Sequence, residues 1–361
     1  MTVTIKDVAR LASVSVATVS RVLNSSAPVN PATRERVLEV ARSLQFVPNG
    51  SARSLSRRRA AALGVILPDL YGEFFSELLR GIDQAAQRGS HSLLVSSSHH
   101  DARGIGIAIR AMRGRVDGLL IMAPEVDAAD VAEVLPAQFP TVLINGAGAG
   151  SSVQSITVDN FGGARAMTEH LISLGRRRIG FIAGAVHNAD ALERERGHHA
   201  ALHAAGMPAD PALYARGDFS EESGWQGAAS LMQRLSPPAA IFAANDAMAI
   251  GAMSWLREHD VAIPERVAVV GFDDIPVARY LNPPLTTVRV GIAALGQQAT
   301  ALLLTALEDR APPDSIASRS VLPTHLVIRD SCGTPTSAPS RQAAPTSTPR
   351  IGFDETSHVS R

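Results

Sequence analysis

The chain of 361 residues is too long for one small domain, and its hydrophobic content of 45% is enough for more than one core. No apolar run approaches the roughly 20 residues that span a bilayer, and the polar N-terminus is unlike a secretory signal. A single cysteine, Cys332, excludes an internal disulfide framework. We therefore expect a cytoplasmic protein of two or three units that packing alone holds together.

The charge is divided unevenly along the chain, although the formal net charge is zero. Residues 1–60 carry ten Lys or Arg against three acids, so this head has a net charge of +7. The remaining residues hold 24 basic and 31 acidic side chains and have a net charge of −7. A basic head on an acidic body indicates a polyanion-binding module joined to a domain with another task.

Three short helices are predicted in the basic head. The first starts at Thr4, which with Asp7 forms a capping pattern, and runs to about residue 12. Ser15 is the N-cap of a second helix over 16–23, and Asn30, followed by proline, starts a third that ends before residue 46. This spacing is typical of a helix-turn-helix domain that binds DNA. A small helical bundle with a solvated basic face fits the same charges.

Three sequence blocks of the head resemble the headpiece of the LacI/GalR repressor family. They are T-I-K-D-V-A at 4–9, T-V-S-R-V-L-N at 18–24 and F-V-P-N at 46–49. Ser13 departs from the family, which usually has Gly or Asn in this turn. The resemblance implies an all-α helix-turn-helix domain over 1–47.

The same resemblance implies a role in DNA binding for specific residues. Val16 and Ala17 occupy the two positions at the start of the recognition helix that choose the operator sequence. Because both side chains are apolar, they can contact a thymine methyl group or tolerate several bases, which leaves Arg21 as the strongest polar reader. The alternative roles of Arg21 are a phosphate contact or a solvated charge. The matching backbone-contact positions are Thr4, Ser15, Thr18, Ser20, Asn24 and Thr33.

Residues 48–60 resemble the hinge that follows this headpiece. Such a short polar segment does not hold a helix by itself, and in the family it orders on operator DNA. Leu55 sits where the family inserts a leucine between base pairs of the minor groove, and we assign Ala52 to the same surface. Without the resemblance, Leu55 would be read as a docking contact with the next domain.

Beyond the hinge, apolar runs alternate with helical patterns, which predicts an α/β fold with parallel sheets covered by helices. The rhythm starts again after about residue 160, so we expect two lobes with a cleft where the carboxyl ends of the strands meet. The predicted strands are 63–67, 92–96, 118–122, 141–144, 156–159, 179–183, 240–244 and 267–272. The predicted helices are 74–88, 102–113, 128–135, 162–174, 191–205, 221–235 and 248–258.

This body resembles the periplasmic-binding-protein-like effector domain of the same repressors. The shared motifs include V-D-G at 116–118, N-D-A-M-A at 245–249 and V-G-F-D-D at 270–274. The resemblance implies an effector-binding and dimerisation domain over 61–331. The end of the chain is rich in Pro, Ser and Thr without apolar periodicity, which predicts a disordered tail over 332–361. The N-lobe would comprise about 61–160 with 290–322, and the C-lobe about 161–289 with 323–331.

Six effector-binding positions follow from the resemblance. Phe75 and Phe219 match aromatic positions that cover a sugar or base ring, although either could be a core residue. Arg194 matches an arginine that grips the effector, and Asp273 a carboxylate that accepts from it. The weaker candidates are Asp190 and Asn245.

Asn188 stands where a purine-responsive branch of the family has an arginine. This difference favours a sugar or similar polyol over a nucleobase as the effector. The nucleobase stays open as the alternative.

Catalytic and cofactor sites find little support in the sequence. The glycine-rich run 145–150 does not open a helix, as a dinucleotide-binding loop would, and G-x-S-x-G is absent. His199 and His203 lie one helical turn apart without a third metal ligand at a fixed spacing. We therefore expect no enzyme, cofactor or metal.

These features together predict a DNA-binding transcriptional regulator, most simply a repressor, under the control of a small polar effector. The segment after residue 332 has no leucine heptad of the kind that tetrameric family members use, so a homodimer without a membrane partner is expected. A ligand-binding protein with only non-specific DNA affinity is the competing hypothesis, because Val16 and Ala17 offer so little polar readout.

Overall fold

A computed structural model describes the helical head and the α/β body of the chain. The hinge positions Ala52 and Leu55 lie outside the described residues, as does the segment after Gly333. The described ranges are 3–24, 27–46, 60–135, 139–146, 153–208, 210–309 and 319–333. No helix within them is long and apolar enough to cross a membrane.

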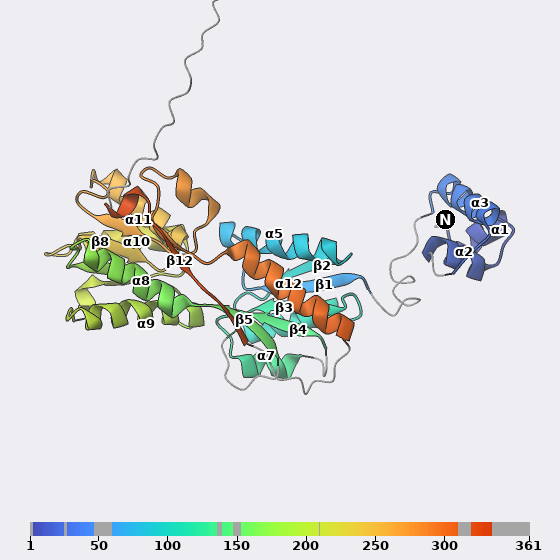
Figure 1. The fold of residues 1–361 in the computed structure, drawn as a ribbon, viewed down its shortest axis with the longest axis horizontal. Coiled ribbons are helices and arrows are strands. Elements are labelled where there is room, and N and C mark those ends of the chain that lie inside the picture. The colour runs from blue at the N-terminus through green and yellow to red at the C-terminus, as the bar shows by residue number, and fades with distance from the viewer. Residues whose placement is uncertain are drawn as a thin grey trace, which may run out of the picture.

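The headpiece consists of α1 (Ile5–Leu11), α2 (Val16–Asn24) and α3 (Pro31–Ser43), as the sequence predicts (Figure 1). Asn30 caps α3 by accepting from the Ala32 N–H at 3.0 Å. The predicted capping pair of Thr4 and Asp7 is present at the start of α1, where the Thr4 N–H and hydroxyl donate to the Asp7 carboxylate at 3.0 and 2.7 Å. Ser13 adopts φ +51°, which explains why relatives favour Gly or Asn there.

Seven buried apolar side chains hold the three headpiece helices together. They come from all three helices and the turns that join them, so no helix stands alone. The seven residues are Val8, Ala9, Ala12, Val19, Val22, Val37 and Ala41.

The N-lobe is built on a six-stranded sheet whose neighbouring strands all pair in parallel, in the order β11-β5-β4-β3-β1-β2. Helices α5 and α12 lie side by side on it (Figure 1). Its strands are β1 (Ala62–Leu67), β2 (Ser92–Ser97), β3 (Gly118–Met122), β4 (Thr141–Ile144), β5 (Gln154–Val158) and β11 (Arg319–Leu322). Its helices are α5 (Glu73–Arg88), α6 (Ala102–Met112), α7 (Ala128–Val134) and α12 (Ile292–Asp309).

The C-lobe is built on a four-stranded parallel sheet in the order β7-β6-β8-β9. Its strands are β6 (Ile179–Ala183), β7 (Tyr214–Arg216), β8 (Ala240–Ala243) and β9 (Ala268–Val270). Its helices are α8 (Asn160–Ser173), α9 (Ala189–Ala204), α10 (Glu221–Met232) and α11 (Asp246–Glu258). Three short 3-10 helices are η1 (Pro211–Leu213), η2 (Pro276–Tyr280) and η3 (Asp330–Cys332).

Strands β10 (Thr287–Arg289) and β12 (His325–Val327) form an antiparallel pair that the sequence did not predict. The chain crosses between the lobes after β5, after β10 and after β11, and Figure 1 shows the last crossing leading into β12. The predicted tail boundary is wrong by at least one residue, because Cys332 is fully buried and its Sγ accepts from the Thr286 hydroxyl at 3.2 Å.

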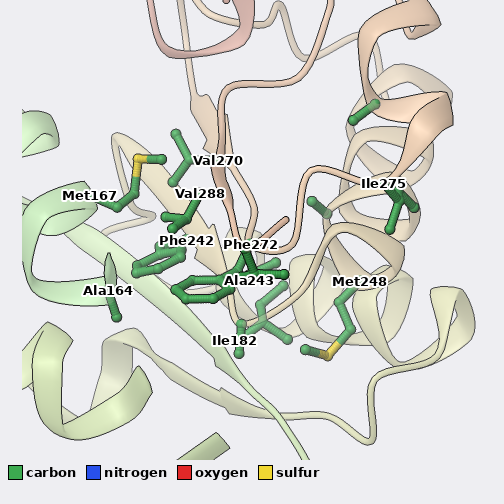
Figure 2. Close-up of a cluster of buried hydrophobic side chains, with 14 of the residues drawn as sticks. Ala164, Met167, Ile182, Phe242, Ala243, Met248, Val270, Phe272, Ile275 and Val288 are labelled. Carbon is green, nitrogen blue, oxygen red and sulfur yellow. The ribbon is translucent and has the colours of Figure 1, made fainter. Parts of the chain in front are cut away.

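The C-lobe core reaches up to the cleft side of its sheet. Figure 2 shows Phe242 and Phe272 among aliphatic side chains that include Met248 and Ile275. Phe242 and Phe272 are fully buried, whereas Ile275 both joins this core and lines a cavity between the lobes. The apolar core therefore forms a rigid floor beneath that cavity.

Candidate functional site

The outward face of α2 carries the residues that the sequence predicted to read DNA. Val19 and Val22 point into the headpiece core, while Val16, Ala17 and Arg21 are exposed. Val16 leaves 42% of its surface exposed. The helical period therefore separates a core face from a face available to a partner.

The hydroxyl groups at the start of α2 are already organised. Ser15 Oγ accepts from the Thr18 N–H at 3.1 Å and lies 2.9 Å from Thr18 Oγ1. Ser20 and Thr33 are half-buried, and Thr4 is exposed. Asn24 ends α2, and its side chain is outside the described structure.

The chain enters the body at Ala60, directly after the predicted hinge. The Ala60 N–H donates to Asp117 Oδ1 at 2.6 Å, and the Asp117 N–H donates to the Ala62 carbonyl at 2.8 Å. His91 Nε2 lies 3.8 Å from the second Asp117 oxygen. Asp117 of the V-D-G motif thus fixes the point at which the hinge joins the N-lobe.

A cavity of about 260 Å³ lies between the lobes. In each sheet it opens at the point where the connections that follow two neighbouring parallel strands turn to opposite sides. These points lie between β1 and β3 and between β6 and β8, and open α/β sheets bind ligands there. All six residues assigned to the effector line it: Phe75, Asp190, Arg194, Phe219, Asn245 and Asp273.

Arg194 is the centre of the polar network in the cleft. It is only 4% exposed, and its Nη2 lies 3.0 Å from Asp273 Oδ1. Its Nε donates to Asn160 Oδ1 at 2.8 Å and its Nη1 to the Ala244 carbonyl at 2.6 Å. The guanidinium also lies 3.9 Å from the centroid of the Phe272 ring. Arg194 is therefore held in one geometry before any ligand binds.

Asp190 connects the two lobes within this network. Its Oδ2 accepts from the side-chain amide of Asn145, which follows β4 of the N-lobe, at 2.8 Å. Its Oδ1 accepts from the Asn160 amide at 2.9 Å. Asp190 is 9% exposed, so it acts as a buried bridge more than as a free ligand group.

Burial dominates the titration of both cleft aspartates. Burial is the main reason why the pKa of Asp190 is raised to about 7; Arg194 and the Asn145 hydrogen bond oppose the shift, and the charges of Asp273 and Glu125 add to it. Burial likewise raises the pKa of Asp273 to about 6, although the Arg194 cation opposes the shift. Near neutral pH the cleft can therefore exchange protons.

Aromatic side chains flank the cavity from both lobes. Phe75 comes from α5 and packs edge-on against Phe74, with ring centroids 5.5 Å apart. Phe219 follows β7 at φ +74°, and its carbonyl accepts from the Asn245 amide at 3.0 Å. Because Asn245 also caps α11 through the Met248 N–H, it ties the Phe219 loop to that helix.

The structure adds cleft residues that the sequence analysis missed. Asn145 and Asn160 bind Asp190, and Glu125 Oε1 accepts from Asn188 across the lobes at 2.7 Å. Asn145 directly follows a strand and Asn160 is the last residue of a V-D-N motif, but neither pattern identifies its partner. His199 Nε2 lies 3.6 Å from Glu195 Oε1 on the same helix. Within the described ranges, no group of three or more side chains that could hold a metal ion occurs.

Known proteins share both parts of this arrangement. Residues 4–49 match the family of bacterial regulatory proteins, lacI family, and residues 168–332 match the periplasmic binding protein-like domain. The HTH-type transcriptional regulator GalR of Escherichia coli (strain K12) is 36% identical over 341 residues, 94% of this chain and 98% of GalR.

Solved structures give the same result. The lac repressor dimer bound to operator and the anti-inducer ONPF matches with a TM-score of 0.82 and 29% identity over 92% of this chain and 99% of that one. The complex of the transcriptional regulator CelR with cellobiose matches with a TM-score of 0.67 and 33% identity over 91% and 99%.

A helix-turn-helix headpiece on a two-lobed body with a polar cleft defines a DNA-binding transcriptional regulator and not an enzyme. The chain belongs to the LacI family.

Proposed function

We propose that the chain is a homodimeric repressor whose affinity for a pseudo-palindromic operator is controlled by a small sugar bound between its lobes. The observation that carries this proposal is the cleft itself. Phe75 and Phe219 flank a preorganised Arg194–Asp273 pair, in a chain whose other end is a helix-turn-helix domain. A concave site in which aromatic side chains surround fixed polar groups is the general form of a small-molecule site.

The polar groups of the cleft suit hydroxyl groups. Asp273 and Asn245 offer acceptors and donors at the ends of β9 and β8, and each sugar hydroxyl can both donate and accept. The cellobiose complex of CelR, which this chain resembles, supports the same ligand class. A nucleobase would find the same aromatic flanks, but Asn188 contributes no cation beside it.

A dimer follows from the geometry of DNA. Two-fold half-sites need two recognition helices, and one headpiece presents only α2. The operator-bound lac repressor relative is a dimer, which supports this stoichiometry. Effector binding would alter how the lobes close and thereby bias the hinge toward or away from its DNA-bound state.

The decisive experiment is fluorescence anisotropy with DNA from upstream of the protein's own gene, against a scrambled duplex at one fixed salt concentration. A panel of sugars and nucleobases is added to each. Sequence-selective binding that one sugar alters supports the proposal. An effect confined to nucleobases would show that the effector is a nucleobase and not a sugar. Equal, weak and steeply salt-dependent binding to both duplexes would instead favour a ligand-binding protein with non-specific DNA affinity.

The hinge is tested in the same assay. Leu55→Ala removes the proposed minor-groove wedge, while Leu55→Met keeps a large apolar side chain. We expect Leu55→Ala to lose specific operator affinity and Leu55→Met to retain most of it. Unchanged affinity in Leu55→Ala would contradict the wedge.

A further inference from the structure

The cavity between the lobes is markedly acidic. Asp190 and Asp273 contribute two of its seven carboxylates, and the others are Asp69, Glu73, Glu125, Asp218 and Glu221. Arg194 is the one arginine or lysine in the described lining, beside the half-exposed His100. Even if Asp190 is protonated, a ligand meets an excess of negative charge.

The positive charge of Arg194 is already committed within the protein. Asp273 pairs with it at 3.0 Å, and Asn160 and the Ala244 carbonyl occupy its Nε and Nη1. A phosphate or carboxylate on a ligand would have to compete with Asp273 for this guanidinium. Because the ion pair is only about 5% exposed on each side, breaking it would leave a buried carboxylate without its cation.

The helix N-termini at the cavity are occupied as well. Helices α5, α9 and α10 begin at its lining, and helix N-termini ordinarily attract anions. Here each has an acidic residue in its first turn: Glu73 in α5, Asp190 in α9 and Glu221 in α10. These side chains satisfy the positive ends of the helices and repel a second anion.

Glu125 places a further carboxylate at the junction of the lobes. Its side chain is 12% exposed, with Oε1 accepting from Asn188 and lying 3.4 Å from His100 Nδ1. Its Oε2 is buried and has no hydrogen-bond partner in the described structure. A buried carboxylate oxygen of this kind calls for a donor, which a hydroxyl or an ammonium group supplies and a phosphate does not.

We propose that the cleft selects uncharged or amine-bearing sugars and rejects phosphorylated sugars and sugar acids. This inference rests on the proposed function and defines the charge class of its effector. A phosphoryl group brings up to two negative charges into a low-dielectric site already lined with carboxylates, where like charges repel far more strongly than in water.

The test compares ligands that differ at one carbon. For each of several hexoses, isothermal titration calorimetry of the full chain at pH 8 measures the parent sugar, its 6-amino-6-deoxy derivative, its uronate and its 6-phosphate. In the series that binds best, we expect the uronate and the 6-phosphate to bind at least about tenfold more weakly than the amine or the parent. A uronate or 6-phosphate that binds as tightly as the amine would overturn the inference.

A charge-removing variant identifies the cause. Glu125→Gln keeps the carbonyl that accepts from Asn188 and removes one charge, so the affinity for the 6-phosphate should rise roughly fivefold relative to the parent sugar. Glu169→Gln removes one charge from the exposed face of α8, where Glu169 pairs with Arg165, and should change nothing. Equal effects of the two variants would also overturn the inference.

Ligand affinity and operator affinity together distinguish a failure of this inference from a failure of the proposed function. A 6-phosphate that binds tightly and alters operator affinity contradicts charge selection and leaves sugar-controlled repression intact. A neutral sugar that binds in the expected charge order but leaves operator affinity unchanged contradicts the proposed control and leaves charge selection intact.

Discussion

The Asn145 amide donates a 2.8 Å hydrogen bond to Asp190 Oδ2, which joins the end of an N-lobe strand to a C-lobe helix. Asp190 continues to Asn160, Asn160 to Arg194 and Arg194 to Asp273. The interlobe contact and the proposed effector-binding groups therefore form one polar network. We predict that a change in lobe closure reaches Arg194 and Asp273 through this network.

Asn145→Ala removes the N-lobe end of this network. A hydrogen bond to a buried carboxylate contributes roughly 1.5–3 kcal/mol, so effector affinity should fall about tenfold or more because the closed cleft loses an interlobe contact. Titration calorimetry measures the change. Thr305→Ala, whose hydroxyl bonds only its own helix, is the control. Unchanged affinity would mean that Asn145 and Asp190 do not couple closure to binding.

Arg194→Lys keeps the positive charge but replaces the planar guanidinium, which bonds three partners, with a single ammonium group. Lysine cannot reach Asp273, Asn160 and the Ala244 carbonyl together, so we expect about 2–4 kcal/mol lower stability and loss of effector binding. Urea unfolding and ligand titration measure both. Arg196→Lys, on the same helix with a side chain 66% exposed, should cost under about 0.5 kcal/mol. Similar losses in the two variants would contradict the central role of Arg194.

The raised pKa of Asp190 predicts that the stability of the folded chain falls as pH rises. Its pKa is about 7 in the folded chain and near 4 when unfolded, so between these values the folded state holds the extra proton. Its stabilising contribution is complete below about pH 4 and is lost as pH rises through 7. In Asp190→Asn the fall in thermal midpoint between pH 5 and pH 8 should therefore be shallower than in the wild type. An identical slope would refute the raised pKa, whatever constant offset the asparagine causes.

The lowered pKa of His198 predicts the opposite dependence at lower pH, where stability falls as pH falls. Burial, with a smaller contribution from the charge of His199, lowers its pKa to about 3, so the unfolded chain alone takes up this proton below about pH 6.5. Stability should fall as pH falls from 6.5, and His198→Gln should reduce that fall. The exposed His203→Gln is the matched control. If both variants retain the full acid slope, other groups carry it.

Arg21→Ala tests the recognition helix. Arg21 is exposed on α2, and losing a base contact costs about 1–3 kcal/mol together with sequence selectivity. Competition with single-base operator variants measures this selectivity. Arg42→Ala removes an exposed cation near the end of α3, where its Nε donates to the Leu38 carbonyl. It should change affinity less and leave selectivity intact. A uniform loss across sequences in Arg21→Ala would show a phosphate contact instead.

The sequence by itself determined the features that depend on local signals. The caps at Ser15 and Asn30 placed α2 and α3, because a side-chain oxygen two or three residues before a helical N–H acts within one turn. Short apolar runs predicted strands such as β3 and β4, and the observed bounds of both strands are the predicted ones. The six effector positions came from motif resemblance, and all of them line the cavity.

Only the tertiary structure decided which of these residues meet. Asn145 lies 45 positions before Asp190, and β11 pairs with β5 across more than 160 positions, distances at which no periodicity or spacing identifies a partner. Strands β7, β10, β11 and β12 have three or four residues each, too few to show an alternating pattern. The raised pKa of Asp190 and the acidic lining of the cleft likewise arise only when two lobes bury carboxylates against each other.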